Sequence, residues 1–205
     1  MKPLCKVSTK ECQGVEICST GFCAGVDEAG RGPLAGPVVA AAVILKPEDI
    51  GKINLKDSKQ LSSRQREDIF KQLISCAVAW KVAVIGPRLI ELINIHNASI
   101  LAMKKAVLKL RPLPNGVLVD GKFKLDGLDI PQQTIIRGDF FCPFISAASI
   151  IAKVFRDRIM VKYHQLYPQY GFDRNKGYPT LEHKEALQRY GPSPIHRRSF
   201  KGVDA

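Results

Sequence analysis

Two adjacent carboxylates, Asp27 and Glu28, stand at the end of an apolar run and lead into the glycine-rich stretch Gly30-Arg31-Gly32. Glycines let backbone N–H and C=O groups approach a ligand closely, and arginine offers a forked cation suited to phosphate. Bound Mg²⁺ commonly joins one or two protein carboxylates to the phosphate oxygens of a substrate. The stretch therefore fits a metal site beside a phosphate, although a hairpin corner with solvated charges would also explain it.

The spacing of the two acids sets a geometric condition. Successive side chains of a strand point to opposite faces, so Asp27 and Glu28 can serve one site only if Glu28 lies where the regular pleat stops. Gly30 supplies the backbone freedom for such a break. We refer to residues 30–37, from Gly30 to Pro37, as the glycine corner.

Two further aspartates follow apolar runs in the same manner. Asp120 comes directly after Val117–Val119, and Asp139 follows the candidate strand Thr134–Ile136. Each aspartate alone is explained by turn chemistry, such as an Asp-Gly turn. Three apolar strands that each end near an acidic residue are better explained if these carboxylates meet in one shared site at the edge of the sheet.

The rest of the pattern predicts an α/β fold. The nearly continuous apolar run Val38–Leu45 indicates burial on both faces, as in a central sheet covered by helices. Further strands are expected at 22–26 and 78–85, with Pro87 as a stop, and a loop at 171–176. Helices are expected from near Ser62, around 100–110, from Pro143 onward and over 181–189. The basic end, 196–201, is either a clamp for a phosphate backbone or a solvated tail.

Composition narrows the function classes. The chain has 205 residues, of which 45% are hydrophobic, enough for one domain with a real core. Its net charge of +12 favours nucleic acid as a partner. No apolar stretch reaches the length of a membrane span. The six cysteines form no C-x-x-C pair, which argues against zinc and for free thiols, and no signal peptide is apparent.

Three segments carry a resemblance to a known family. The run from Gly25 to Ala40 resembles the opening signature of type 2 ribonuclease H, the bacterial ribonuclease HII family. The segment Ser146–Arg158 and the segment Gly177–Thr180 are similar to two further motifs of that family. The related ribonuclease HIII class has a different pattern after the paired acids and an extra N-terminal domain. Phe140-Phe141 departs from the family, in which small or basic residues are common after the aspartate.

The resemblance implies the ribonuclease H-like fold, a mixed central sheet flanked by helices with a helical C-terminal region. It implies an enzyme that hydrolyses the RNA strand of RNA·DNA hybrids and incises duplex DNA on the 5′ side of single ribonucleotides. Four acids would hold two divalent cations, Mg²⁺ or Mn²⁺. These acids are Asp27, Glu28, Asp120 and Asp139. The implied substrate contacts are Gly30, Arg31, Gly32, Ser58, Lys59 and Tyr178.

The expected organisation is a short N-terminal extension, residues 1–20, followed by one catalytic domain, residues 21–205. A cytoplasmic monomer without membrane contact is expected, with hybrids and ribonucleotide-containing duplex DNA as partners. Two alternatives stay open at this point. A non-catalytic nucleic-acid-binding protein would explain the charge but not the acids, and a DNA nuclease of the same fold would also use an acidic metal cluster.

Overall fold

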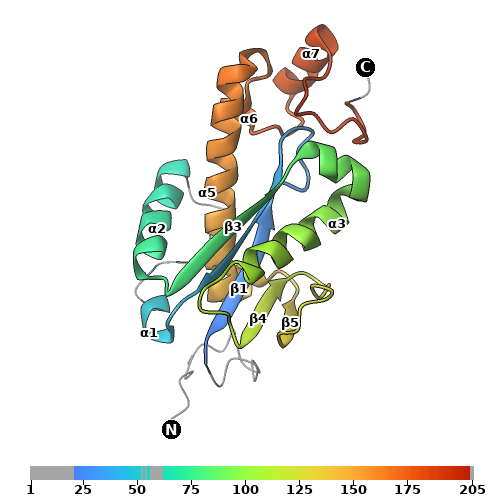
Figure 1. Cartoon of the computed structure of the whole chain (residues 1–205). Helices are drawn as coiled ribbons and strands as arrows, with labels where there is room; N and C mark the ends of the chain where they lie inside the picture. Colours follow the sequence, from blue (N-terminus) through green and yellow to red (C-terminus); the bar gives the residue numbers. More distant parts are fainter. Residues whose placement is uncertain (1–20, 52, 54, 56–61, 204–205) are drawn as a thin grey trace.

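The computed structural model describes residues 21–51, 53, 55 and 62–203. Within these residues the strands form one mixed sheet in the order β3-β2-β1-β4-β5 (Figure 1). The strands are β1 (Cys23–Ala29), β2 (Val38–Ile44), β3 (Ala79–Ile85), β4 (Gly116–Asp120) and β5 (Gln132–Ile135). Strands β1 to β3 pair antiparallel, whereas β4 runs parallel to both β1 and β5. The expected ribonuclease H-like arrangement of a mixed sheet flanked by helices is confirmed.

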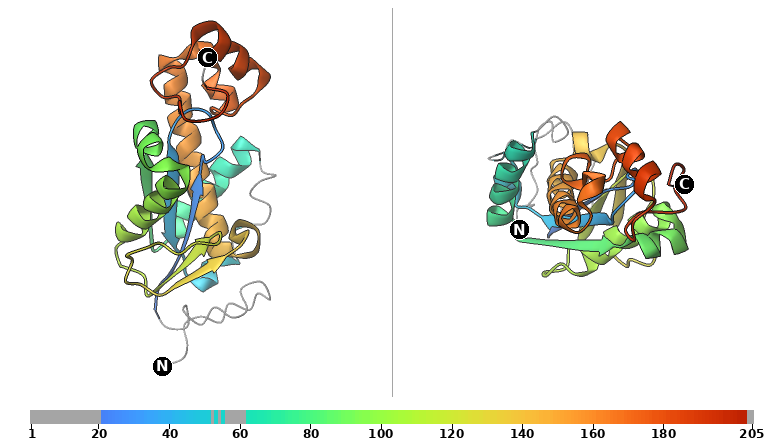
Figure 2. Two further views of the ribbon diagram at one scale, coloured as in Figure 1. Left: turned by 90° about the vertical axis from the view of Figure 1, so that its right-hand side faces the viewer. Right: turned by 90° about the horizontal axis from the view of Figure 1, so that it is seen from above.

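Helices cover both faces of this sheet. Helices α2 and α5 pack on one face and α3 on the other, as the two views of Figure 2 show. The longer helices are α2 (Ser63–Cys76), α3 (Pro87–Leu108), α5 (Pro143–Leu166) and α7 (Leu181–Tyr190). The short ones are α1 (Pro47–Ile50), α4 (Gly138–Phe141), α6 (Phe172–Asn175) and a 3-10 turn, Pro168–Tyr170.

Strand β2 confirms the interpretation of the apolar run. All its residues are buried, because α5 covers one face and α3 the other. Helix α2 begins where the capping pattern predicts. The Ser62 side chain accepts from the Gln65 backbone N–H at 3.3 Å, while the Gln65 Oε1 accepts from the Ser62 N–H at 2.9 Å. These bonds satisfy two N–H groups that a helix start leaves open.

Pro87 ends β3 as predicted, but it also opens a helix. It occupies the first turn of α3, where its missing N–H is no loss. The helix is kinked at Asn94, which has a φ of 63°, and the Asn94 Oδ1 accepts from the Asn97 N–H at 3.0 Å. Asn94 therefore caps the second half of α3, the part that the apolar spacing had indicated.

The C-terminal region forms a small core of its own at the far end of α5. Its buried side chains come from the glycine corner, α5, the 3-10 turn, α6, α7 and the segment after α7. Figure 2 shows this region stacked beyond the end of the sheet. The expected loop at 171–176 is wrong, since it contains α6. Gly171 and Lys176, both with positive φ, bracket this single helical turn.

Cys23, at the start of β1, is disulfide-bonded. This corrects the expectation that all six cysteines are free thiols.

Candidate active site

The paired acids lie near the end of β1, but the pleat does not break between them. The ladder with β2 continues through Glu28 and Ala29, which face Ala40 and Val39. The expected break at Glu28 is therefore wrong, and the backbone departs from strand geometry only at Gly30, which has a φ of 100°. What does stop earlier is the ladder with β4, whose last pair is Val26 with Val119. The acids thus sit beside an edge of β1 that β4 leaves open.

Close packing of α5 on β1 brings a hydroxyl to Asp27. A Cβ at Gly25 would lie 2.2 Å from the carbonyl oxygen of Phe144, so only glycine allows this approach. The small side chains of the first turns of α5, including the buried Ala147 and Ala148, serve the same end. As a result, Ser149 reaches Asp27 and hydrogen-bonds its carboxylate.

Asp120 ends β4, and its carboxylate supports the next segment of the site. Its Oδ1 accepts from the Gly138 N–H at 2.7 Å, at the first residue of α4. Asp139 follows Gly138 directly and is buried, with 9% of its surface exposed. Asp139 was expected directly at the end of a strand, but it lies in a helical turn instead. After β5 the backbone of Arg137 adopts the left-handed conformation, and α4 begins at the next residue. The carboxylate of Asp120 thus holds the helical turn that carries Asp139.

The electrostatics show that three of the acids act on one another. Burial, with the charges of Glu28 and Asp120, raises the pKa of Asp27 well above its usual value, although Ser149 opposes the shift. Burial raises the pKa of Glu28 as well, and Asp120 adds to this against the opposing charge of Arg31. Burial and mutual repulsion both disfavour the charged form of these carboxylates. The site is therefore stabilised when a carboxylate takes up a proton or when a cation binds between the acids.

The donor chemistry fits a hard divalent cation, since the acids offer only oxygen ligands. In the described part of the chain, however, no three His, Cys, Asp or Glu side chains are gathered closely enough to hold a metal ion. The raised pKa values of Asp27 and Glu28 are the observation that favours a cation here.

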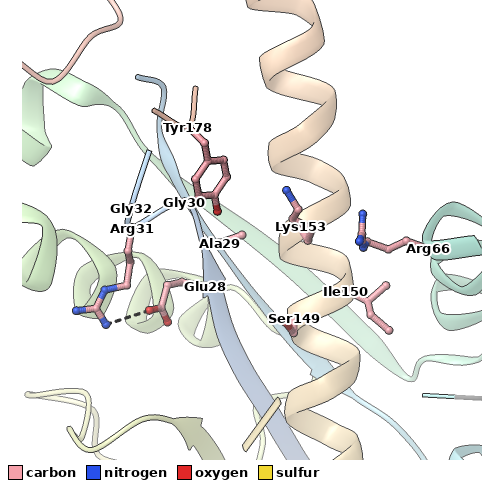
Figure 3. Close-up of a pocket in the computed structure, with 10 residues that line it drawn as sticks. All are labelled: Glu28, Ala29, Gly30, Arg31, Gly32, Arg66, Ser149, Ile150, Lys153 and Tyr178. Atoms are coloured by element: carbon pink, nitrogen blue, oxygen red, sulfur yellow. Dashed lines mark hydrogen bonds and ion pairs between the residues drawn. The ribbon is translucent and has the colours of Figure 1, made fainter. Parts of the chain in front are cut away.

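A pocket of about 410 Å³ opens beside these acids (Figure 3). Its walls come from the end of β1, the glycine corner, α2, α5 and the loop before α7. The lining residues are Glu28, Ala29, Gly30, Arg31, Gly32, Arg66, Ser149, Ile150, Lys153 and Tyr178. Four of the predicted substrate contacts, Gly30, Arg31, Gly32 and Tyr178, are therefore brought together. The other two, Ser58 and Lys59, lie outside the described residues.

Cations face the acids across this pocket. Arg31 Nη1 lies 3.3 Å from the Glu28 Oε1, an ion pair drawn in Figure 3. Lys153 and Arg66 stand on the opposite wall, and both approach Asp157, at 2.6 Å and 3.9 Å. Burial lowers the pKa of Lys153. The sequence did not single out Arg66, Ser149 or Lys153, although the last two lie in the segment that carries the resemblance.

The basic end of the chain is not simply a solvated tail, because part of it is buried. Arg197 is fully buried and His196 is 3% exposed, whereas Arg198 is exposed. The chain turns back here so that His196 bridges to Ala35 of the glycine corner. Carbonyl groups of the corner that lack a strand partner accept from Arg197 instead. A run of basic residues in a sequence gives no signal that one of them is buried in such a role.

Comparison with known proteins decides the family. A family model described as Ribonuclease HII matches residues 24–203. The chain belongs to the ribonuclease HII family. The ribonuclease HII of Pelotomaculum thermopropionicum is 51% identical over 181 residues, which cover 88% of this chain and 68% of that protein. As a member of the ribonuclease HII family, the chain is an endonuclease of the ribonuclease H type.

Solved structures agree with this assignment to ribonuclease HII. The ribonuclease H2 of Pyrococcus horikoshii OT3 matches with a TM-score of 0.80 at 31% identity, over 89% of this chain and 95% of that one. A Bst ribonuclease HIII in complex with Mn²⁺ matches with a TM-score of 0.72 at 20% identity, over 89% and 68%. At that identity the second likeness shows the fold alone. None of the described helices combines the length and apolarity that a membrane crossing requires.

Proposed function

We propose that this chain hydrolyses the RNA strand of RNA·DNA hybrids and incises duplex DNA on the 5′ side of a single embedded ribonucleotide. The products would carry 3′-hydroxyl and 5′-phosphate ends. One observation carries the proposal: the glycine corner and Tyr178 form the walls of one pocket that opens directly beside the paired acids. A site that only bound nucleic acid would have no use for buried carboxylates that repel one another.

The four acids supply the metal-binding part of the proposal. Asp27, Glu28, Asp120 and Asp139 would hold divalent cations, Mg²⁺ or Mn²⁺. Bound there, such cations supply an activated water and charge stabilisation of the leaving 3′ oxygen. The chain's own part is to fix these ligands. Ser149 orients Asp27, and the contact between Asp120 and the Gly138 N–H fixes the start of α4.

The remaining pocket residues would position the substrate. A 2′-hydroxyl is both donor and acceptor, so backbone groups of Gly30, Arg31 and Gly32 can recognise it without reading a base. Tyr178 stands opposite, with its ring 3.8 Å from where a Cβ of Gly32 would lie. A deoxyribose in the next nucleotide would pack against this ring, whereas a 2′-hydroxyl would crowd it. Lys153 and Arg66 would contact the phosphate backbone of the substrate, and we propose that Ser58 and Lys59 contact it as well.

The wider setting is also part of the proposal. Residues 21–205 would act as one catalytic domain after the extension of residues 1–20. The protein would work as a cytoplasmic monomer in ribonucleotide excision, during DNA replication and repair. The net charge of +12 supports affinity for duplexes in general.

Conservative amide variants test the metal-binding acids. Asp27→Asn, Glu28→Gln, Asp120→Asn and Asp139→Asn should each weaken Mn²⁺ binding, measured by titration calorimetry, and reduce cleavage at least about 100-fold. Asp126→Asn changes an exposed acid and serves as the control. Full activity in Asp120→Asn would leave that residue as a turn aspartate only. Cleavage of all-DNA duplexes by the wild-type protein would favour a DNA nuclease, and binding without cleavage would favour a binding protein.

A further inference from the structure

Arg197 is buried, and the four hydrogen bonds that it donates all go to carbonyl groups of the glycine corner. Its Nε donates to the Gly36 carbonyl at 2.9 Å, its Nη1 to the Arg31 carbonyl at 3.0 Å and its Nη2 to the Gly30 carbonyl at 2.6 Å. Its backbone N–H donates to the Leu34 carbonyl at 2.8 Å. Arg197 therefore holds both ends of the corner from the inside, while the buried Arg156 donates to the carbonyls of Ala35 and Pro37.

These bonds determine where the N–H groups of the corner point. In a trans peptide the C=O and the following N–H point in opposite directions. Since the carbonyls of Gly30 and Arg31 point inward to Arg197, the N–H groups of Arg31 and Gly32 point away from the interior. Both residues line the pocket. Two consecutive N–H groups that face the same way form a concave donor site of the kind that binds oxygen atoms.

His196, the residue before Arg197, connects to the opposite wall of the pocket. Its Nδ1 accepts from the Ser193 backbone N–H at 2.9 Å, so its proton belongs on Nε2. That Nε2 lies 3.0 Å from the Nε2 of His183, whose proton then belongs on Nδ1, 2.9 Å from the Tyr178 carbonyl. A relay of neutral histidines thus ends on the backbone of Tyr178.

The protonation states agree with this relay. Burial and the neighbouring His183 lower the pKa of His196 to about 4, and burial lowers the pKa of His183. Both rings are therefore neutral at pH 7, with one N–H each. Burial and the charge of Arg156 lower the pKa of Arg197 to about 9, which leaves its guanidinium protonated.

We propose that His196 and Arg197 are positioning residues that set the two walls of the ribonucleotide pocket. Arg197 aims the N–H groups of Arg31 and Gly32 at the 2′-hydroxyl, and His196 acts through His183 to hold Tyr178 against the neighbouring sugar. The inference rests on the proposed function. It adds that the selectivity of the pocket is set from the C-terminal segment, by two residues that do not line the pocket.

Arg197→Lys tests the first wall, because it keeps the charge but removes the fork that reaches three carbonyls. We expect kcat/KM to fall about 100-fold on both a single-ribonucleotide duplex and a continuous hybrid, as for a misplacement of about 1 Å. Affinity for an all-DNA duplex should stay unchanged. Arg198→Lys makes the same change at the exposed neighbour and should match the wild type. Equal activities of the two variants would overturn the role of Arg197.

His196→Phe and His196→Gln test the second wall. Phenylalanine keeps the ring shape without its nitrogens, whereas glutamine can still present an N–H to His183. We expect His196→Phe to lower kcat/KM about tenfold on the single-ribonucleotide duplex and less on the continuous hybrid. In His196→Gln we expect kcat/KM on the single-ribonucleotide duplex to return toward the wild-type value. An equal loss on both substrates that glutamine does not recover would show a purely structural role.

Amide exchange in the wild-type protein keeps the inference testable if a variant fails to fold. The N–H groups of Arg31 and Gly32 should exchange fast in the free protein and become protected when an uncleaved single-ribonucleotide duplex binds in Ca²⁺. Those of Leu34 and Gly36, bonded to Gly177 and Ile195, should be protected throughout. Protection of Arg31 and Gly32 before substrate is added would overturn the inference. A wild-type protein that cleaves neither substrate would overturn the proposed function, while the exchange pattern of the free protein would still report on the Arg197 contacts.

Discussion

Gly25→Ala tests the packing that positions the site. The added Cβ would lie 2.2 Å from the carbonyl oxygen of Phe144 and 2.7 Å from the Ile145 nitrogen. Ordinary contact begins near 3.4 Å, so β1 and α5 would have to separate by about 1.2 Å. Both obstacles are backbone atoms, which cannot rotate away as a flexible side chain would.

The magnitude follows from this separation. Overpacking of a core costs about 3 kcal/mol at the upper end of its usual range, and backbone clashes belong there. For a chain of this size that loss lowers the melting temperature by about 6 to 12 °C. Because Ser149 moves with α5, its hydrogen bond to Asp27 should also be lost. A shift of about 1 Å at a reacting group reduces kcat/KM about 100-fold.

Guanidinium unfolding and hybrid cleavage, measured on the same preparation, provide the assay. Gly51→Ala is the matched control, because its backbone has an ordinary φ of −70° and a Cβ there meets nothing within 4 Å. The control should remain within about 0.5 kcal/mol of the wild type. A Gly25→Ala protein that matches Gly51→Ala in both measurements would refute the close contact between α5 and β1 and the route by which Ser149 reaches Asp27.

Three further predictions follow from the site and its surroundings. Asp27→Asn should raise the melting temperature of the metal-free protein, because burial and two neighbouring acids disfavour its charge; no gain over Asp126→Asn would contradict this. Tyr178→Ala should reduce kcat/KM about tenfold on a single-ribonucleotide duplex, with Tyr178→Phe close to wild type, and an equal loss on a continuous hybrid would indicate packing instead. The contribution of His196 to stability should fall as the pH drops from 6.5 toward 4, since His196 binds its proton near 6.5 when unfolded but only near 4 when folded. The raised pKa values of Asp27 and Glu28 act in the opposite direction, so the measurement is the difference in unfolding free energy between the wild type and His196→Phe, which keeps both acids. That difference should shift by about 2 kcal/mol against the wild type between pH 7 and pH 4.5, and a difference that does not change with pH would contradict the buried neutral relay.

Much of the architecture could be predicted from the sequence, because it depends on local patterns. The apolar run of β2 indicated burial on both faces, and the pair Ser62 and Gln65 indicated the start of α2. The small residues at the start of α5 indicated its close approach to the sheet. In each case the signal and the structure it predicts lie within a few residues of one another.

Long-range contacts could not be predicted. The burial of Arg197 depends on carbonyl groups more than a hundred residues earlier in the chain, and an arginine between other basic residues suggests a surface. The placement of Asp139 depends on Arg137, which turns left-handed and starts a helical turn after β5. The relay from His196 to Tyr178 depends on α7, which brings His183 into contact with both the Tyr178 carbonyl and the His196 ring.

The paired acids are an intermediate case. Their position near the end of a strand that leads into the glycine corner was predicted correctly, but the expected break in the pleat was not, since β2 keeps pairing through Ala29. Hydrogen bonding to a neighbouring strand decides where a strand ends, and a single sequence shows only the residues that permit the end. Gly30 permits it and is the residue at which the backbone turns.

The most direct test of the proposed function is cleavage of a labelled DNA duplex that carries one ribonucleotide, with the product ends mapped. With Mg²⁺ present, we expect a single incision on the 5′ side of that ribonucleotide and a 3′-hydroxyl on the upstream fragment. We expect no product in EDTA or from Asp27→Asn. An incision on the 3′ side, or cleavage that persists without divalent cations, would contradict the proposed function.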